Sequence, residues 1–159
     1  MNTSVKIKSQ TELQEQIKNW KSEGHKVVFS NGCFDILHLG HIDYLEKARN
    51  LGDKLVIGLN SDDSVRKLKG PERPINQSSA RAKMLAALAF VDGVTIFEEE
   101  TPEKLIEFLS PDILVKGSDY SVETILGAKY VLSQGGEVKT IDLVEGYSTT
   151  NIIDKIKEK

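Results

Sequence analysis

Two histidines are set three residues apart in the stretch NGCFDILHLGH at residues 31–41, directly after the apolar run Val27–Phe29. A spacing of three places His38 and His41 on one face of a helix that begins near this point. The unpaired N–H groups of a helix N-terminus and the helix dipole both attract anions. Gly40 between the histidines allows a ligand to approach the backbone closely. The pattern therefore predicts a phosphate-binding turn between a strand and a helix.

Two further polar segments follow apolar runs later in the chain. KGSDY begins at Lys116, after the run Ile113–Val115, and GYSTTN spans residues 146–151. Each segment alone is typical of an ordinary turn or a helix N-cap. Because both follow predicted strands, they are candidate parts of the same site as the two histidines.

A basic segment, KLKGPERPIN at residues 67–76, joins two predicted helices. Its two prolines and its glycine disfavour regular structure, and it carries Lys67, Lys69 and Arg73. Loops of this length and charge commonly have a function. No GxGxxG and no GxxxxGK[ST] motif is present, so any phosphates would be held without either of these loops. We call residues 67–76 the basic loop.

Apolar runs and helical periodicity alternate along the chain. The predicted strands are residues 26–30, 55–60, 94–97, 113–116 and 138–142. The predicted helices are residues 10–23, 40–50, 61–68, 79–90, 101–110, 122–134 and a last helix after residue 150. This alternation predicts an α/β, Rossmann-like, doubly wound parallel five-stranded sheet with helices on both faces. In that fold the polar loops at the carboxyl ends of the strands converge on one crevice.

The N-terminal helix has a clear start signal. Ser9 to Glu12 form a capping box, and Leu13, Ile17 and Trp20 follow at helical spacing. We expect this helix, about residues 9–24, to pack across the sheet edge of an α/β core at residues 25–159. The whole chain, residues 1–159, is then expected to be a single domain.

Composition and charge exclude several classes of protein. The 159 residues are 39% hydrophobic with a formal net charge of −3, and the spread of the lysines argues against a nucleic-acid partner. The longest apolar run, Met84–Val91, is far shorter than the ~20 residues of a membrane-spanning helix. The N-terminus lacks the apolar core of a signal peptide, and the single Cys33 excludes an internal disulfide. We expect a cytoplasmic protein that binds small molecules or a second copy of itself.

The motifs together resemble a known family. NGCFDILHLGH is similar to the signature of the nucleotidyltransferase superfamily that shares HxGH with class I aminoacyl-tRNA synthetases, and GYSTTN matches the second half of its nucleotide site. The series NGCFDILHLGH, GLNSDDSVRKLKG, RPIN, LVKGSDY and GYSTTNII resembles the D-glycero-D-manno-heptose 1-phosphate adenylyltransferases, which activate heptose for the lipopolysaccharide core. The resemblance covers nearly the whole chain from about residue 25.

The resemblance implies transfer of AMP from ATP to a heptose 1-phosphate, giving ADP-heptose and pyrophosphate, with Mg²⁺ bridged mainly by phosphates. The sugar phosphate is itself the nucleophile, so catalysis needs positioning and charge neutralisation rather than a nucleophilic side chain. The implied catalytic residues are His38, His41, Lys69 and Arg81. The implied nucleotide-binding residues are Asn31, Gly32, Cys33, Phe34, Asp35, Gly40, Lys116, Gly117, Asp119, Tyr147, Ser148 and Thr149. The implied acceptor-binding residues are Asn60, Asp62, Lys67 and Arg73.

Two alternatives remain open. The related glycerol phosphate cytidylyltransferases carry an arginine before the serine and threonine turn, in RTxGIST, where this chain has Leu143 to Tyr147. A cytidylyltransferase for a small alcohol phosphate is therefore less favoured, and Lys69 or Arg81 must replace the missing cation. The second alternative is a nucleotide-binding regulatory module without turnover. The resemblance also implies a homodimer.

Overall fold

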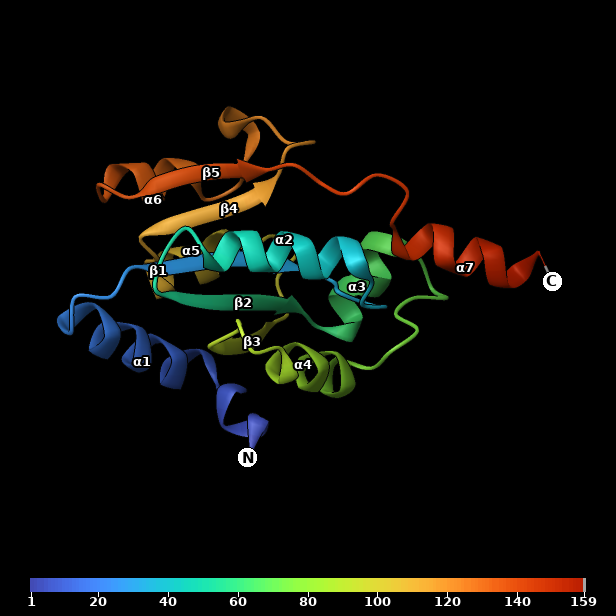
Figure 1. The fold of residues 1–159 in the computed structure, drawn as a ribbon, viewed down its shortest axis with the longest axis horizontal. Helices are drawn as coiled ribbons and strands as arrows, with labels where there is room; N and C mark the ends of the chain where they lie inside the picture. The colour runs from blue at the N-terminus through green and yellow to red at the C-terminus, as the bar shows by residue number, and fades with distance from the viewer. Residues whose placement is uncertain (159) are drawn as a thin grey trace.

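The computed structural model describes residues 1–158 and contains a sheet of five parallel strands (Figure 1). The strands are β1 (Val27–Gly32), β2 (Lys54–Asn60), β3 (Gly93–Phe97), β4 (Ile113–Gly117) and β5 (Glu137–Ile141). The helices are α1 (Gln10–Ser22), α2 (Leu39–Arg49), α3 (Asp62–Lys69), α4 (Ser78–Ala87), α5 (Glu103–Leu109), α6 (Ala128–Ser133) and α7 (Thr149–Lys157), with 3-10 turns η1 (Thr3–Lys6) and η2 (Val122–Thr124). The predicted α/β fold with a parallel five-stranded sheet is confirmed.

Helices cover both faces of the sheet because its strands are apolar on both sides. On one face α2 and α4 contribute Leu45 and Leu85 to a buried cluster with Val28 of β1. On the other face α1, α5 and α6 form a second buried cluster, in which Ile17 of α1 joins Phe29 of β1. Successive side chains of β1 therefore point to opposite faces, as the period of a strand requires.

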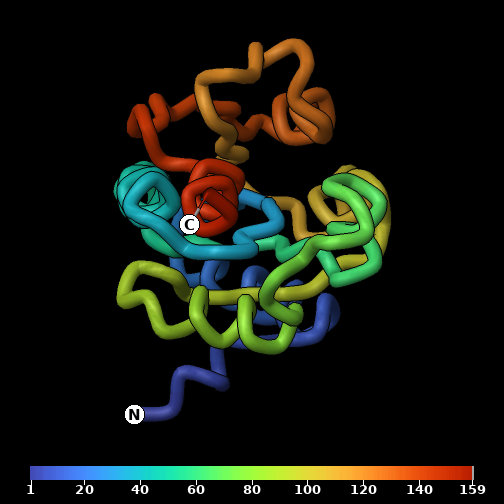
Figure 2. Tube along the Cα trace, turned by 90° about the vertical axis from the view of Figure 1, so that its right-hand side faces the viewer, coloured from blue at the N-terminus to red at the C-terminus, as the bar shows by residue number. Residues whose placement is uncertain are grey.

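The strand order β3-β2-β1-β4-β5 changes direction at β1. The chain moves outward from β1 through β2 to β3, and then crosses to the other side of β1 to form β4 and β5. At such a switch point the loops after the two neighbouring strands diverge and leave a crevice at the carboxyl ends. Figure 2 looks onto this end of the molecule, where α7 lies in front, beside α2.

Two predicted boundaries are wrong in ways that affect the crevice. Asn31 and Gly32 belong to β1 and pair with β2, whereas the sequence placed them in the turn after the strand. The helix predicted at residues 122–134 divides into η2 and α6. It is interrupted because Gly127 adopts a left-handed φ of 86° just before α6. The segment between β4 and α6 is therefore irregular and borders the crevice.

The N-terminal helix begins as predicted, with the Ser9 hydroxyl accepting a hydrogen bond from the Glu12 N–H at 3.2 Å. Its position differs from the prediction. Leu13 and Ile17 are buried on one face of the sheet, beside α5, so α1 does not lie across the sheet edge. The segment before α1 reaches that edge instead, where Ile7 forms a bridge with Val94 of β3.

The C-terminal helix α7 differs from the other α-helices because none of its residues is buried. In Figure 1 it extends away from the sheet. Its first residue still touches the core of the site, since the Thr149 hydroxyl donates to the Ile36 carbonyl oxygen at 3.4 Å. Neither α7 nor any other helix among residues 1–158 is long and apolar enough to cross a membrane.

Candidate active site

A cavity of about 790 Å³ opens at the switch point, over the carboxyl ends of β1 and β4. This volume suits a nucleotide-sized ligand. The predicted site residues that line it are Asn31, Gly32, Cys33, Phe34, Asp35, His38, Gly40, His41, Asn60, Lys69, Arg73, Lys116, Gly117, Asp119, Tyr147, Ser148 and Thr149. Three predicted residues, Asp62, Lys67 and Arg81, do not line it.

The two histidines lie face to face at the start of α2. The ring centroids of His38 and His41 are 3.8 Å apart, and their planes differ by 22°. Neither buried Nδ1 atom has a hydrogen-bond partner among the described residues. Burial, together with the neighbouring His38, lowers the pKa of His41 to about 4, and burial also lowers the pKa of His38. Both rings are therefore neutral at pH ~7, with polar nitrogens available to a ligand.

The backbone before the histidines is shaped by Phe34 and two glycines. Phe34 has a left-handed φ of 45°, and its ring packs edge to face against His41 with centroids 5.1 Å apart. A Cβ on Gly32 would lie 2.9 Å from the Phe34 ring. A Cβ on Gly40 would lie 3.0 Å from the His38 ring and 3.2 Å from Tyr147 Cβ. The glycines therefore allow these rings to approach one another beside the cavity.

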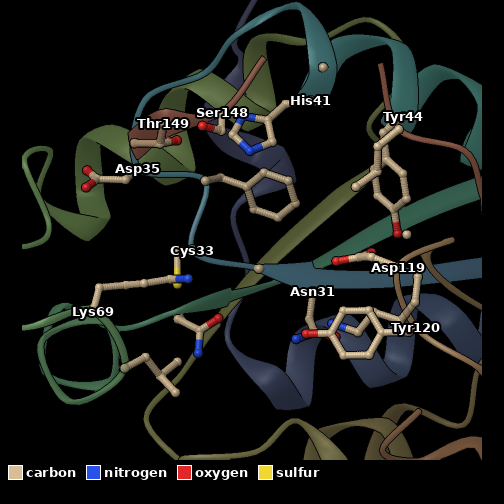
Figure 3. Close-up of a pocket in the computed structure, with 18 of the residues that line it drawn as sticks. Asn31, Cys33, Asp35, His41, Tyr44, Lys69, Asp119, Tyr120, Ser148 and Thr149 are labelled. Atoms are coloured by element: carbon tan, nitrogen blue, oxygen red, sulfur yellow. The ribbon is translucent and has the colours of Figure 1, made fainter. Parts of the chain in front are cut away.

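Ser148 and Thr149 stand at the N-terminus of α7 beside His41 (Figure 3). Ser148 is the N-cap, and its hydroxyl accepts a hydrogen bond from the Asn151 N–H at 3.0 Å. A helix N-terminus leaves several N–H groups without intrahelical partners, and its dipole favours an anion. The structure thus brings together two segments that are more than 100 residues apart in the sequence, as the motifs predicted.

Asp35 lines the cavity, but its carboxylate is committed to the chain itself. It is 1% exposed and accepts hydrogen bonds from Arg73 Nε at 2.6 Å and from the N–H groups of Ile75 and Asn76 at 2.8 and 2.9 Å. Burial raises the pKa of Asp35, yet these hydrogen bonds outweigh it and hold the pKa below its ordinary value. The Asp35 carboxylate therefore anchors the basic loop, and the contact of this residue with the nucleotide stays a prediction. Arg73 is its ion-pair partner.

Arg81, which was predicted as a catalytic residue, does not line the cavity. Arg81 is completely buried. Its guanidinium donates to the carbonyl oxygens of Cys33, Asn60 and Asn76 at 2.6, 2.9 and 2.8 Å, and to the Asp62 carboxylate at 2.7 Å. All of its interactions fix loops around the cavity. Asp62 has the same structural role, as the ion-pair partner of Arg81.

Lys69 and Arg73 are the cations of the basic loop that line the cavity, and Arg73 is paired with Asp35. In Figure 3 the side chain of Lys69 runs toward Cys33 and into the cavity. No ion pair to Lys69 is present among residues 1–158, in contrast to Arg73. Lys67 points elsewhere: its amine lies 4.0 Å from Glu100 and its side chain is largely exposed.

Burial raises the pKa of Cys33, which leaves its thiol protonated and supports its interpretation as a packed residue.

Several lining residues were not predicted. Three of them are exposed apolar side chains, Tyr120, Leu126 and Leu143. Others are Glu100, Pro102 and Thr124. Their position after β3, β4 and β5 is the signal that sequence analysis had available, because loops at the carboxyl ends converge.

Comparison with known proteins places this geometry in a family. A family model described as cytidylyltransferase-like matches residues 29–155. The chain is 53% identical over 154 residues to the bifunctional protein HldE of Marinomonas sp. (strain MWYL1), covering 97% of this chain and 32% of HldE. It is 55% identical over 155 residues to HldE of Citrifermentans bemidjiense, covering 98% of this chain and 32% of that protein. The chain therefore spans about a third of the length of these relatives.

Solved structures give the same result. The lipopolysaccharide core biosynthesis protein from Thermoplasma volcanium aligns with a TM-score of 0.61 and 31% identity, over 79% of this chain and all of that chain. Pantoate-beta-alanine ligase from Francisella tularensis aligns with a TM-score of 0.59 over 96% of this chain and 78% of that one, at 16% identity, which shows the fold alone. The family resemblance drawn from the motifs is confirmed. The chain belongs to the cytidylyltransferase-like family.

Proposed function

We propose that this chain transfers AMP from ATP to a heptose 1-phosphate, giving ADP-heptose and pyrophosphate. The observation that carries the proposal is the stacked pair His38 and His41 beside the N-terminus of α7, at the switch point of the sheet. The motif series, the HldE relatives and the lipopolysaccharide core biosynthesis protein support the acceptor class.

In the reaction a phosphate oxygen of the sugar attacks the α-phosphorus of ATP. The bond from the α-phosphorus to its bridging oxygen breaks, and pyrophosphate leaves with the electron pair. The neutral rings of His38 and His41 donate hydrogen bonds to the α-phosphate and the bridging oxygen, where negative charge develops. Their fixed stacking positions these donors before the reaction begins.

We assign the remaining parts of the nucleotide to other residues that line the cavity. Ser148, Thr149 and the N-terminus of α7 hold the β- and γ-phosphates. Gly117, Asp119 and Tyr147 line the adenosine end, where a Cβ on Gly117 would lie 2.5 Å from the Asp119 carboxylate. Lys116, whose amine lies 5.5 Å from the Tyr120 ring, borders the same end.

The acceptor phosphate binds beside Lys69, which replaces the arginine missing before the serine and threonine turn. Asn60 and Arg73 border this region, and Lys67 extends its positive charge toward solvent. The cation that accompanies ATP is Mg²⁺, which neutralises charge on the phosphates when bound. Among residues 1–158, no three His, Cys, Asp or Glu side chains are grouped so that they could hold a metal ion. We therefore propose that the phosphates of ATP would supply most of the ligands of Mg²⁺.

The proposal has a cellular context. Residues 1–159 act as a single nucleotidyltransferase domain in the cytoplasm, where ATP and the sugar phosphate are available, and its partners are small molecules rather than nucleic acid or membrane. A homodimer is the expected assembly by resemblance to the family.

The test is a pyrophosphate-release assay that offers ATP, CTP and GTP, each with heptose 1-phosphate, glycerol 3-phosphate or phosphopantetheine. Turnover with ATP and heptose 1-phosphate is the expected result. Turnover only with CTP and glycerol 3-phosphate would make the chain a cytidylyltransferase. Nucleotide binding without turnover of any acceptor would make it a regulatory module.

A further inference from the structure

Asn31, near the end of β1, has a buried side-chain oxygen with no hydrogen bond. Its Oδ1 finds no partner among the described residues, although the residue lines the cavity (Figure 3). A buried acceptor without a donor costs free energy, and native chains rarely keep one without a purpose. The oxygen therefore marks a position where a ligand supplies a donor.

The side chain of Asn31 lies on the face of the sheet opposite the histidines. Side chains of β1 alternate, so Asn31 shares the face of Phe29, which packs with α1, α5 and α6. Ser30 points to the other face, where its hydroxyl lies 2.9 Å from Tyr44 of α2. In Figure 3 His41 and Ser148 lie on one side of β1 and Asn31 on the other. Asn31 thus lines the cavity from the side of β1 opposite His41.

The neighbours of Asn31 suit a neutral ligand with hydroxyl groups. Its register partner on β2 is Gly58, where a Cβ would lie 2.8 Å from the Phe29 ring and 2.9 Å from Leu105. Asn60 lies on the same face two residues further along β2, and its amide nitrogen is occupied by the Ser64 hydroxyl at 2.9 Å. Glu100 and Thr124 also line the cavity. Carboxylate and amide oxygens accept from hydroxyl donors, whereas phosphate oxygens offer no donors to them.

We propose that Asn31 is a specificity-determining residue whose Oδ1 accepts a hydrogen bond from a hydroxyl group of the sugar acceptor, on the side of the sheet away from His38 and His41. This assignment rests on the proposed function and deepens it. It moves Asn31 from the nucleotide, where the motif placed it, to the acceptor. The acceptor phosphate then points toward Lys69, and its polyol part toward the α5 side of the cavity.

The test compares Asn31→Leu, which removes the acceptor oxygen at similar size, with Asn31→Asp, which keeps it. Asn31→Leu is expected to raise the KM for heptose 1-phosphate about 10-fold or more, with the KM for ATP nearly unchanged. Asn31→Asp should retain most of the affinity for the sugar. The matched control is Asn19→Leu on the exposed face of α1, which should change neither constant.

Acceptors with single hydroxyls replaced by hydrogen sharpen the test. In the wild-type chain, one such analogue should lose about 10-fold in kcat/KM, and in Asn31→Leu the same analogue should lose little more than heptose 1-phosphate itself. A higher KM for ATP alone would place Asn31 at the adenine and overturn the proposal. Unchanged constants, or a wild-type chain indifferent to every analogue, would also overturn it.

The proposed function and the role of Asn31 would be contradicted by different results. A wild-type chain that turns over no sugar phosphate contradicts the proposed function and, with it, this assignment. A wild-type chain that turns over heptose 1-phosphate while Asn31→Leu behaves like Asn19→Leu contradicts only the role of Asn31. Thermal unfolding of each variant separates a lost contact from a lost fold, and the analogue series on the wild-type chain tests the assignment without any variant.

Discussion

Two adjacent segments line the cavity, the turn after β1 and the N-terminus of α7, and they are held by very different means. The turn after β1 is fixed by two buried charged groups, since Arg81 binds the Cys33 carbonyl and Asp35 binds the basic loop. The N-terminus of α7 is held by a weak hydrogen bond to Ile36, and its helix buries no residue. The fold therefore holds the turn that carries His38 and His41 in place before a ligand binds. The N-terminus of α7, with Ser148 and Thr149, depends far less on the core.

This difference assigns different tasks to the two segments. A preformed turn keeps the His38 and His41 donors in position at no cost during the reaction. A loosely held helix is free to adjust when a triphosphate arrives, because ligand binding stabilises the segments that contact it. Changes in the turn after β1 should thus lower the stability of the fold and kcat, while changes at the N-terminus of α7 should weaken ATP binding.

The largest expected effect follows from Arg81→Met. The change leaves three buried carbonyl groups and the Asp62 carboxylate without their donor, so the free energy of unfolding should fall by about 3–5 kcal/mol. Urea unfolding measures it. Arg66→Met is the control, because Arg66 pairs with Asp63 on the surface and its removal should cost less than about 1 kcal/mol. Equal losses in the two variants would show that Arg81 does not hold the turn.

His41→Ala should lower kcat about 100-fold or more, because it removes one donor to the developing charge. The KM for ATP should change much less than kcat. The matched control is His25→Ala, whose ring lies on the surface near Glu23 and away from the cavity. Steady-state kinetics on folded variants measure both effects, and an unchanged kcat in His41→Ala would remove this residue from the mechanism.

The stability of the chain should fall as the pH is lowered from about 6.5 to 4. Burial holds the pKa of His41 at about 4 in the folded chain, whereas the unfolded chain binds a proton at pH ~6.5. Since the unfolded state then carries the extra proton, the free energy of unfolding decreases through this window by on the order of 1–3 kcal/mol. His41→Ala should flatten the dependence.

Asp35 contributes in a separate window. Its pKa is lowered in the folded chain, so its contribution is present above its ordinary value of 3.8 and is lost only below it. Denaturant unfolding of the wild-type chain and of His41→Ala at several pH values between about 4 and 7 therefore isolates the contribution of His41, because the carboxylates are common to both. Equal slopes for the wild-type chain and His41→Ala would contradict the buried neutral state of His41.

Ser148→Ala should produce the smallest change in stability. It removes the N-cap of a helix that buries nothing, so global unfolding should shift by less than about 0.5 kcal/mol, while the KM for ATP rises about 10-fold. Ser9→Ala is the comparison, because it removes the N-cap of α1, which buries Leu13 and Ile17. That variant should lose about 1 kcal/mol and keep its KM. The reverse pattern would contradict the contrast between the two segments.

Sequence patterns predicted the ligand-facing parts of the site better than the parts behind them. His38, His41, Ser148 and Thr149 are set by local signals, a helix start and a spacing of three, and the alternation of strands and helices brings their loops to one edge. The alternation of strands and helices in the sequence already favours a doubly wound sheet. A sheet of this kind has a switch point where the strand order reverses.

The supporting residues are harder to predict because their partners come from distant segments. Arg81 meets carbonyl groups of three separate loops, and no spacing in the sequence reveals such a set. One signal was available: Arg81 lies four residues before the buried Leu85 on the same helix face, where a cation is expected only with partners. Glu100 and Thr124 were missed although their loops follow β3 and β4, since only the folded chain shows that these two residues line the cavity.

The most direct test of nucleotidyl transfer follows the fate of each phosphate of ATP. The wild-type chain is incubated with heptose 1-phosphate and ATP that carries a radiolabel on either the α- or the γ-phosphate. We expect the α-label in the sugar nucleotide and the γ-label in pyrophosphate. Transfer of the γ-label to the sugar, or no transfer of the α-label, would contradict nucleotidyl transfer by this site.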